Sequence, residues 1–455
     1  MSESISSMFV RQLSLIGVFI SIAVVVLDAG MFNAVLPMVG TAFPAKVGGV
    51  FWIINFYQMV LLASLLLFGV LADFAGQKFV FLGGLIVFLC GSVYGALSEN
   101  LLALSIARGV QGLGASAMTS VNIALLRLMF SGARLPYMIG VSTVVVALSS
   151  TAAPIVAVEL YNIDRWASIF VLDIVLALVA FILIFRGLPA KSAPSTLFCF
   201  RTDFLWSGTA LVMSSIFIVI GWCGYVESKR SILIVLGFLV CCLLCWVVFK
   251  KQAMVSLTCS VGRSSLWCWI VSVLAYAGQA SSLVALPFLI SGQSESGINE
   301  IGWQLALWSG CSGITGPLAS YFFNVGRMSA VGLLLSGLVL MFSGMALLAS
   351  LGMLSLPDAV PVCMVLSGAG FGLFQISNIL ILMKSTPLHY SARINSYIAV
   401  GRCFGQMVGV ATASALFSLD LPSVEFRIFR YSAALVLIAL VLAMVSGLNS
   451  YPRKK

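Results

Sequence analysis

The chain has 455 residues, of which 61% are apolar and only 8% are charged, and its formal net charge is +10. Soluble proteins carry about 25% charged residues, so this composition excludes an ordinary soluble protein and indicates a polytopic membrane protein. Basic residues beside apolar segments indicate first of all how the segments are oriented in the membrane. The positive charge therefore does not indicate binding to nucleic acid. Eight of the 11 cysteines fall inside apolar runs and no Cys/His spacing is that of a metal site. We therefore expect no disulfide framework, metal or cofactor.

Fourteen apolar runs are long enough to cross a hydrocarbon core of roughly 30 Å as helices that rise about 1.5 Å per residue. They lie at residues 13–36, 49–72, 79–97, 101–128, 136–160, 167–186, 203–222, 231–249, 266–290, 301–323, 328–350, 357–383, 392–418 and 429–447. The first run lacks a clear cleavage site of small residues after it and exceeds a signal-peptide core in length. We expect it to be retained as the first helix.

The basic residues predict the topology. With the amino terminus in the cytoplasm, 16 of the 24 fall on the inner side and six on the outer side. This bias favours an even number of helices with both termini cytoplasmic, in a multi-pass protein of the plasma membrane. The pattern predicts an all-α protein in three parts: a six-helix bundle over 1–186, an inserted helix pair with flanking inner loops over 187–265, and a second six-helix bundle over 266–455.

The first apolar run contains a carboxylate, Asp28, within the stretch Leu27–Pro37. A charged Asp near the middle of a membrane helix costs about 2.5 to 3.5 kcal/mol on insertion scales. Either it makes a buried ion pair or an inward hydrogen bond, or it is a proton or cation site, which is the default reading of an ionisable group at this depth.

A short inner turn follows the second run and contains Gly69, Asp73, Gly76 and Lys78. We expect Gly69 to let two helices approach, Asp73 to cap the helix that follows, and Lys78 to lie at the membrane face. A similar turn with Gly316-Pro317 and Gly326-Arg327 follows the second helix of the later half. Such echoes are typical of the parallel repeats of transporters.

The fourth run places Arg108 beside Gln111 and several glycines. Arginine does not release its proton in proteins, so inside a bilayer it must meet an acid or line water. The alternative is a purely structural arginine.

The next two runs combine small residues with acids. Ser149, Ala153 and Ala157 recur every four residues and predict a face for close helix packing, with a kink at Pro154. Glu159 is expected to end that helix on the outer side. Asp173, in the run 167–186, is a second intramembrane acid, although it could instead snorkel to the outer interface. Near the end of the chain, Arg402 stands alone among the glycines of the stretch Gly401–Ala411.

Several of these stretches resemble motifs of the major facilitator superfamily. The turn Gly69–Lys78 is similar to its signature loop, with Phe74 and Gln77 where that loop has basic residues. The run Leu104–Ala115 resembles its second motif, whose arginine is linked to proton transfer. The small-residue helix keeps the proline of the antiporter motif but not its glycines, and Asp173 stands where relatives carry Asn. Nearly the whole chain is similar to the 14-helix drug:proton antiporters.

The resemblance implies a major facilitator fold of two six-helix bundles plus two additional helices, acting as a monomer in the lipid bilayer. It also implies proton-driven export of amphipathic, often cationic drugs or biocides by alternating access, and a gating role for the signature loop. Asp28 would take up a proton from outside as substrate leaves, and Arg108 would adjust its proton affinity. Asp173 or Glu159 would attract the cationic substrate. The remaining candidates for substrate binding are Asn33, Gln111 and Arg402.

Three alternatives remain. A transporter for a specific metabolite or siderophore, without proton antiport, is supported by the departures in the small-residue helix and the signature loop. A membrane-embedded enzyme has little support, because the only histidine, His389, falls in an inner loop and no acid and nucleophile stand at a fixed spacing. A sensor or scaffold is disfavoured by the two intramembrane arginines, which are costly without a water-filled path.

Overall fold

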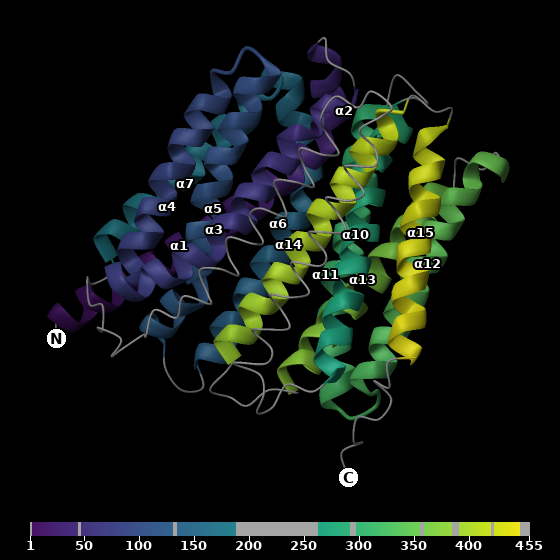
Figure 1. Cartoon of the computed structure of the whole chain (residues 1–455). Helices are drawn as coiled ribbons and strands as arrows, with labels where there is room; N and C mark the ends of the chain where they lie inside the picture. The colour runs from purple at the N-terminus through teal and green to yellow at the C-terminus, as the bar shows by residue number, and fades with distance from the viewer. Residues whose placement is uncertain are drawn as a thin grey trace. The chain divides into compact units, whose positions relative to one another are not determined.

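The structure is a computed structural model, and every regular element in its described residues is a helix. The described residues are 2–43, 47–130, 134–187, 263–291, 297–354, 359–384, 391–419 and 423–445. Twelve of the predicted apolar runs coincide with the twelve long helices of this part of the chain (Figure 1). The predicted runs 203–222 and 231–249 lie outside the described residues.

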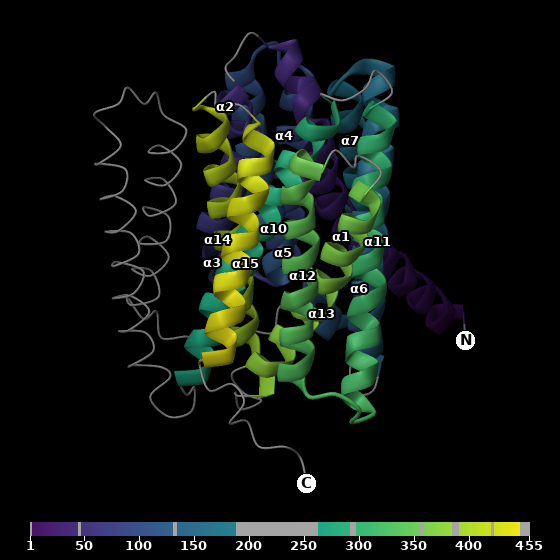
Figure 2. The same ribbon diagram turned by 90° about the vertical axis from the view of Figure 1, so that its right-hand side faces the viewer.

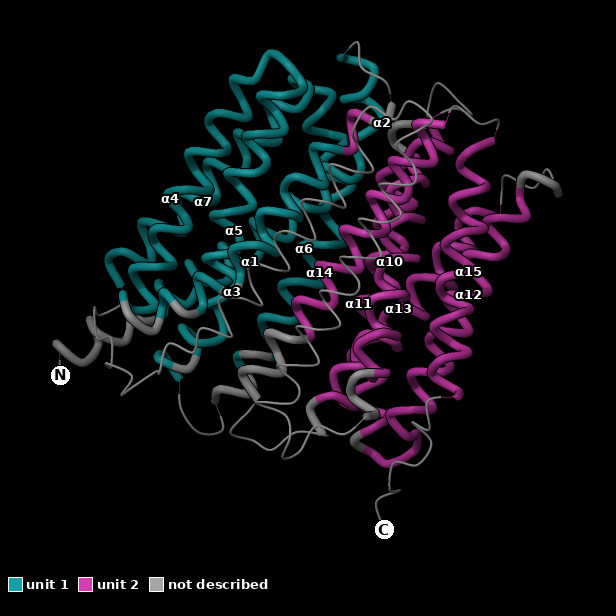
Figure 3. The backbone as a smooth tube through the Cα atoms, in the orientation of Figure 1, with its two compact units in different colours: residues 1–45, 52–216 teal, residues 46–51, 217–455 magenta. Residues whose placement is uncertain are grey.

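The chain divides into two compact units (Figure 3). The long helices of the first unit are α1 (Ser2–Ala42), α3 (Trp52–Ala75), α4 (Gln77–Ala96), α5 (Leu101–Met129), α6 (Arg134–Asp164) and α7 (Ala167–Gly187). Within this unit α1 packs against α6 and α7, α5 packs against α3 and α4, and α4 also packs against α7.

The second unit repeats this packing scheme. Its helices are α2 (Val47–Val50), α10 (Arg263–Ser291), α11 (Gly297–Asn324), α12 (Ala330–Leu354), α13 (Val360–Lys384), α14 (Ser391–Phe417) and α15 (Val424–Val445). Here α10 packs against α14 and α15, α13 packs against α11 and α12, and α12 also packs against α15 (Figure 2). Each unit thus has six long helices, and the helices of one unit correspond to those of the other in chain order, as expected for parallel repeats.

Glycines make the same helix contacts in both units. A Cβ added to Gly91 of α4 would lie 2.7 Å from the amide nitrogen of Gln111 on α5. A Cβ added to Gly344 of α12 would lie 2.7 Å from the amide nitrogen of Ser367 on α13. Ordinary carbon contacts lie at about 3.5 to 4.0 Å, so only glycine permits these approaches. The two crossings are built alike.

One short segment differs from the predicted division of the chain. Residues 46–51 group with the second unit, although they fall within the predicted first bundle, 1–186. Phe51 stacks with Phe288 at 5.4 Å and with Phe417 at 5.3 Å between ring centroids. Aromatic contacts at these distances add to the apolar area that the rings bury, and they anchor this segment to the second unit.

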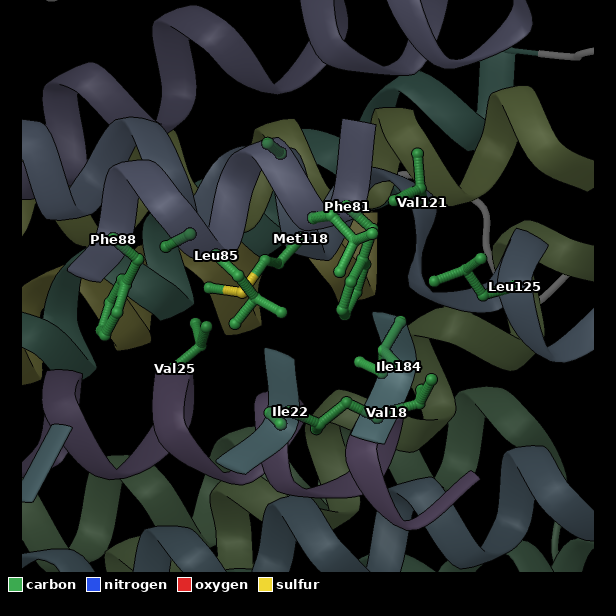
Figure 4. Close-up of a cluster of buried hydrophobic side chains, with 14 of the residues drawn as sticks. Val18, Ile22, Val25, Phe81, Leu85, Phe88, Met118, Val121, Leu125 and Ile184 are labelled. Atoms are coloured by element: carbon green, nitrogen blue, oxygen red, sulfur yellow. The ribbon is translucent and has the colours of Figure 1, made fainter. Parts of the chain in front are cut away.

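Nine of the described helices are long and apolar enough to cross a membrane. The first unit also has an apolar core, to which α1, α3, α4, α5 and α7 contribute, and Figure 4 shows part of it. Val25 of α1, Phe88 of α4 and Ala115 of α5 are members of this core, and so is Ala177 of α7. On each of these four helices, the core ends within about one turn of a buried polar residue; these residues are Asp28, Ser92, Gln111 and Asp173.

Candidate functional site

Asp28 and Arg108 form a buried ion pair in the first unit. Arg108 Nη1 donates to Asp28 Oδ1, and the side chains of both residues are almost fully enclosed. The pair joins α1 to α5. A lone charge of either sign would be costly at this depth, and pairing offsets part of the cost of removing both from water.

The pair belongs to a network that reaches four helices. Arg108 Nη1 also donates to Oε1 of Gln111 at 2.6 Å, one helical turn away on α5. Gln111 Nε2 donates to Ser92 Oγ of α4 at 2.8 Å and, more weakly, to Asp173 Oδ2 of α7 at 3.4 Å. Gln111 therefore connects the ion pair to the second acid, and α1, α4, α5 and α7 all contribute to one polar cluster.

Two aromatic rings hold the guanidinium of Arg108. Its central carbon lies 4.2 Å from the ring centroid of Phe32 on α1 and 4.4 Å from that of Tyr57 on α3. A cation within about 6 Å of a ring face is attracted by the ring, more strongly when water is excluded. The rings therefore help to keep the charge in place within the bundle.

Three polar atoms of the cluster lack a hydrogen-bond partner. They are Oδ2 of Asp28, Nε of Arg108 and Oδ1 of Asp173, all enclosed by protein. Most buried polar atoms in proteins are paired, so unpaired oxygens on two carboxyl groups mark a place that a proton or another donor would stabilise.

The apolar core and an aromatic pair enclose the cluster from opposite sides. The core members of α1 and α4 precede Asp28 and Ser92 in sequence, and those of α5 and α7 follow Gln111 and Asp173. On the side away from the core, Phe32 contacts Phe170 of α7 at 5.1 Å between ring centroids.

Of the two readings left open for Asp173, the structure excludes a position at the outer interface. Its side chain is fully buried and faces the cluster, so it does not reach out to the outer interface. The helix packing decides this, because α7 turns the face with Asp173 and Ala177 inward.

Three further candidates for substrate binding are Glu159, Asn33 and Arg402. Glu159 is exposed, and α6 continues to Asp164, so it does not end the helix as predicted. Asn33 is half-buried on α1. In the second unit, Arg402 of α14 is exposed although its neighbours Gly401 and Cys403 are buried.

The predicted roles of two residues in the inner turn are wrong. A Cβ added to Gly69 would meet no atom within 4 Å, so this glycine does not mediate a close approach within the described residues. Asp73 lies in the last turn of α3, and the cap position of α4 is Gly76, with a φ of 91°. A positive φ favours glycine, which explains why the turn requires this residue.

Lys78 connects α4 to α7. Its Nζ donates to the backbone carbonyl oxygen of Phe185 at 3.1 Å and lies 5.8 Å from the centroid of the Phe185 ring. Phe185 is in the last turn of α7, where unpaired carbonyls attract cations. The lysine thus binds the end of the helix that carries Asp173.

The small-residue face of α6 packs against α1. Ser149, Ala153 and Ala157 are buried, as is Pro154. A Cβ added to Gly30 of α1 would lie 2.7 Å from the Cβ of Ala153. This contact lies about half a turn from Asp28, so close packing of α6 helps to fix the height of the acid.

Sequence reasoning missed Ser92, Phe32 and Tyr57. Serine is common in these helices and usually bonds to its own backbone, so nothing in the sequence singles out Ser92. The two aromatic residues resemble the many that face lipid. Periodicity from Asp28 points to Phe32, one turn further on α1, but Tyr57 is found only through tertiary packing.

Comparison with known proteins gives the fold. Residues 18–198 match the family described as "Major Facilitator Superfamily". The crystal structure described as "peptide transporter POT in complex with sulfate" is similar, with a TM-score of 0.72, 16% identity, and coverage of 95% of this chain and 93% of that one. The chain therefore has the major facilitator fold, which is a fold of membrane transporters and not of enzymes.

Three relatives align along most of the chain. The "Uncharacterized transporter YebQ" of Escherichia coli (strain K12) is 29% identical over 98% of this chain and 97% of its own length. The "Riboflavin transporter RibZ" of Clostridioides difficile (strain 630) is 24% identical over 89% and 87%. The "Multidrug resistance protein Stp" of Mycobacterium tuberculosis (strain CDC 1551 / Oshkosh) is 24% identical over 90% and 76%.

Proposed function

We propose that this multi-pass membrane protein with the major facilitator fold is a proton-coupled exporter of amphipathic, cationic compounds. It would work in the plasma membrane by alternating access between its two bundles, with both termini cytoplasmic. The observation that carries the proposal is the buried Asp28–Arg108 ion pair of the first unit, in which Oδ2 of the Asp28 carboxyl has no hydrogen-bond partner.

The proton would act on this ion pair. When Asp28 is ionised it is attracted to Arg108, and when it is protonated that attraction falls to a hydrogen bond. Each of these two states of Asp28 would favour a different arrangement of α1 against α5.

The substrate class is supported by two observations. The relative named a multidrug resistance protein aligns over 90% of this chain. In addition, Glu159 of α6 is an exposed acid within a candidate membrane span, where a carboxylate attracts cations. Asp173 is enclosed and bonded to Gln111, so of the two acids predicted to attract a cationic substrate we retain Glu159.

The test of the proposal is Asp28→Asn. In everted vesicles energised by a pH gradient, wild-type protein should move a fluorescent quaternary cation into the vesicle lumen, and the variant should not, because Asn is nearly the same shape as Asp but binds no proton. The matched control is Glu99→Gln, which removes an exposed acid from the connection between α4 and α5 and should transport normally. Proton-driven efflux that persists in Asp28→Asn would refute the assignment.

A second candidate is transport of one specific solute without proton exchange. It is favoured by the relative named a riboflavin transporter and by Ala153-Pro154, which departs from the glycines of antiporters. Proton release by detergent-solubilised protein on addition of a substrate separates the two. Release with a quaternary cation supports the exporter, whereas binding of a flavin without release supports the alternative.

A further inference from the structure

Asp28 and Asp173 are two carboxyl groups of one enclosed hydrogen-bonded cluster. Gln111 connects them, because it accepts a hydrogen bond from the arginine that pairs with Asp28 and donates one to Asp173, and both carboxyl groups are fully buried. Each has one oxygen bonded to a donor, from Arg108 or from Gln111, and one oxygen with no donor. An ionised carboxylate only accepts hydrogen bonds, so two in one enclosed cluster repel unless one carries a proton.

The charges of the cluster lead to the same conclusion. From the elements around the acids, α5 contributes Arg108 and Gln111, α4 contributes Ser92, and α3 contributes Tyr57 through its stacking on the guanidinium. With both acids ionised and one guanidinium, this cluster carries a net charge of −1. One bound proton makes it neutral, and a pair of carboxyls that share a proton is the usual outcome when two acids occupy one enclosed site.

The second unit contains a neutral version of the same pair. Ser281 of α10 and Ser432 of α15 are hydrogen-bonded at 2.8 Å between their Oγ atoms, and both are fully buried. α10 corresponds to α1 and α15 to α7. The positions on α7 and α15 also match. Asp173 comes three residues after the buried dipeptide Ile169-Phe170, and Ser432 comes three residues after the buried dipeptide Ile428-Phe429.

The position of Arg108 on α5 can also be matched to a position on α13 of the second unit. A Cβ on Gly112 of α5 would touch the backbone carbonyl of Tyr57 on α3, and a Cβ on Gly368 of α13 would touch that of Trp308 on α11. The residue four positions earlier is Arg108 in α5 and the buried Met364 in α13. Thus the unit with two acids has a cation, and the unit with two hydroxyls has an apolar side chain.

We propose that Asp28 and Asp173 form one carboxyl–carboxylate site that holds a single shared proton, as the two serines share a hydroxyl hydrogen in the second unit. Binding forms one O–H bond on either carboxyl and an O–H···O bond to the other, and release breaks both, while Arg108 stays paired throughout. Asp173 is therefore a second proton-binding residue and not a substrate ligand. That the shared proton is the one exchanged in transport rests on the proposed function.

The test is infrared spectroscopy of the purified whole protein in lipid. The difference spectrum between wild type and Asp28→Asn/Asp173→Asn should contain the C=O band of one protonated carboxyl, shifted in D2O, at neutral pH. Either single variant should also lack the band, because the remaining acid is alone with Arg108 and becomes ionised. Loss of the band in both single variants is the signature of sharing.

Two results would overturn the proposal. One is a band that persists in either single variant, which would assign the proton to one acid alone. The other is a wild-type protein without the band near neutral pH. If an Asn variant fails to fold, Asp28→Ser and Asp173→Ser give the same test, and the triple variant Asp28→Ser/Arg108→Met/Asp173→Ser, which copies the second unit, should fold and lack the band.

Transport assays separate this proposal from the proposed function. If both hold, Asp173→Asn should abolish efflux driven by a pH gradient but retain exchange of substrate for substrate, which moves no net proton. A band that follows the sharing pattern in a protein without proton-driven efflux would refute the proposed function alone. Proton-driven efflux that survives in Asp173→Asn, together with a band that survives there, would refute the shared site alone.

Discussion

At the scale of single residues, the cluster depends on the shape of Arg108 as much as on its charge. The guanidinium is planar, so it can lie over the rings of both Phe32 and Tyr57 while Nη1 donates to Asp28 and Gln111. An ammonium group is a compact point charge that cannot reproduce this arrangement. The position therefore selects arginine over lysine.

We accordingly predict that Arg108→Lys impairs the protein although it conserves charge. The variant should unfold at a lower temperature, since it loses stacking on two rings worth about 0.5 to 2 kcal/mol each, and proton-driven efflux should fall. Thermal unfolding of the purified protein and proton-driven transport into everted vesicles measure the two effects. Arg327→Lys, at an exposed arginine between α11 and α12, is the control, and equal behaviour of the two variants would contradict this account.

The site was only partly predictable from single residues. Charged residues in apolar runs are rare enough to be noticed, so Asp28, Arg108 and Asp173 could be identified from the sequence. Their arrangement could not, because the facing of α7 depends on its packing against α1 and α4. Ser92 was unpredictable for a different reason, since a serine is inexpensive anywhere on a membrane helix and becomes informative only when Gln111 is seen to donate to it.

At the scale of elements, the helices follow from the sequence but their contacts do not. Twelve of the fourteen predicted apolar runs lie in the part of the chain that the structure describes, and all twelve are helices, because backbone groups in a bilayer must be satisfied within the segment. Which glycines support helix crossings is set by the neighbouring helix. Gly69 has open space where close packing was expected, whereas Gly91 lies directly against the backbone of Gln111.

This contrast gives a matched pair of substitutions on α4. A Cβ on Gly91 would lie 2.7 Å from the amide nitrogen of Gln111 and 2.9 Å from its Cγ, but one on Gly83 would meet nothing within 4 Å. We expect Gly91→Ala to destabilise the protein by about 1 to 3 kcal/mol through overpacking and to displace Gln111 from Asp173. Gly83→Ala should have little effect or stabilise α4 slightly.

Thermal unfolding and vesicle efflux test this pair of variants. Gly91→Ala should lower both the unfolding temperature and the coupling of efflux to protons, because Gln111 connects the ion pair to the second acid. Equal unfolding temperatures for the two alanine variants would show that α4 can move away from α5 at no cost, contrary to the contacts described.

At the scale of the whole molecule, the two units share a packing scheme but differ in charge. Corresponding helices make corresponding contacts, and corresponding glycines support them. Yet the first unit contains two acids and an arginine where the second has Ser281, Ser432 and Met364. A duplicated scaffold can thus confine ionisable chemistry to one bundle, and the hydroxyl pair shows that the fold itself does not require charge at this position.

The charge distribution along the whole chain makes a final prediction about topology. Sixteen of the 24 basic residues fall on one side if the stretch 187–265 crosses the membrane twice, and a single crossing there would invert every later helix and remove the bias. Glu99 and Arg327 are exposed in connections on either side of this stretch. We expect them on opposite faces of the membrane, Glu99 outside and Arg327 inside.

Cysteine labelling can decide this in intact cells. A membrane-impermeant maleimide should label Glu99→Cys directly but Arg327→Cys only after the cells are permeabilised, with background from native cysteines subtracted using the unsubstituted protein. Labelling of both positions from outside would mean an odd number of crossings between 187 and 265. The second bundle would then be inverted relative to the first, so the two units would be inverted and not parallel repeats, and such a result would refute the positive-inside assignment.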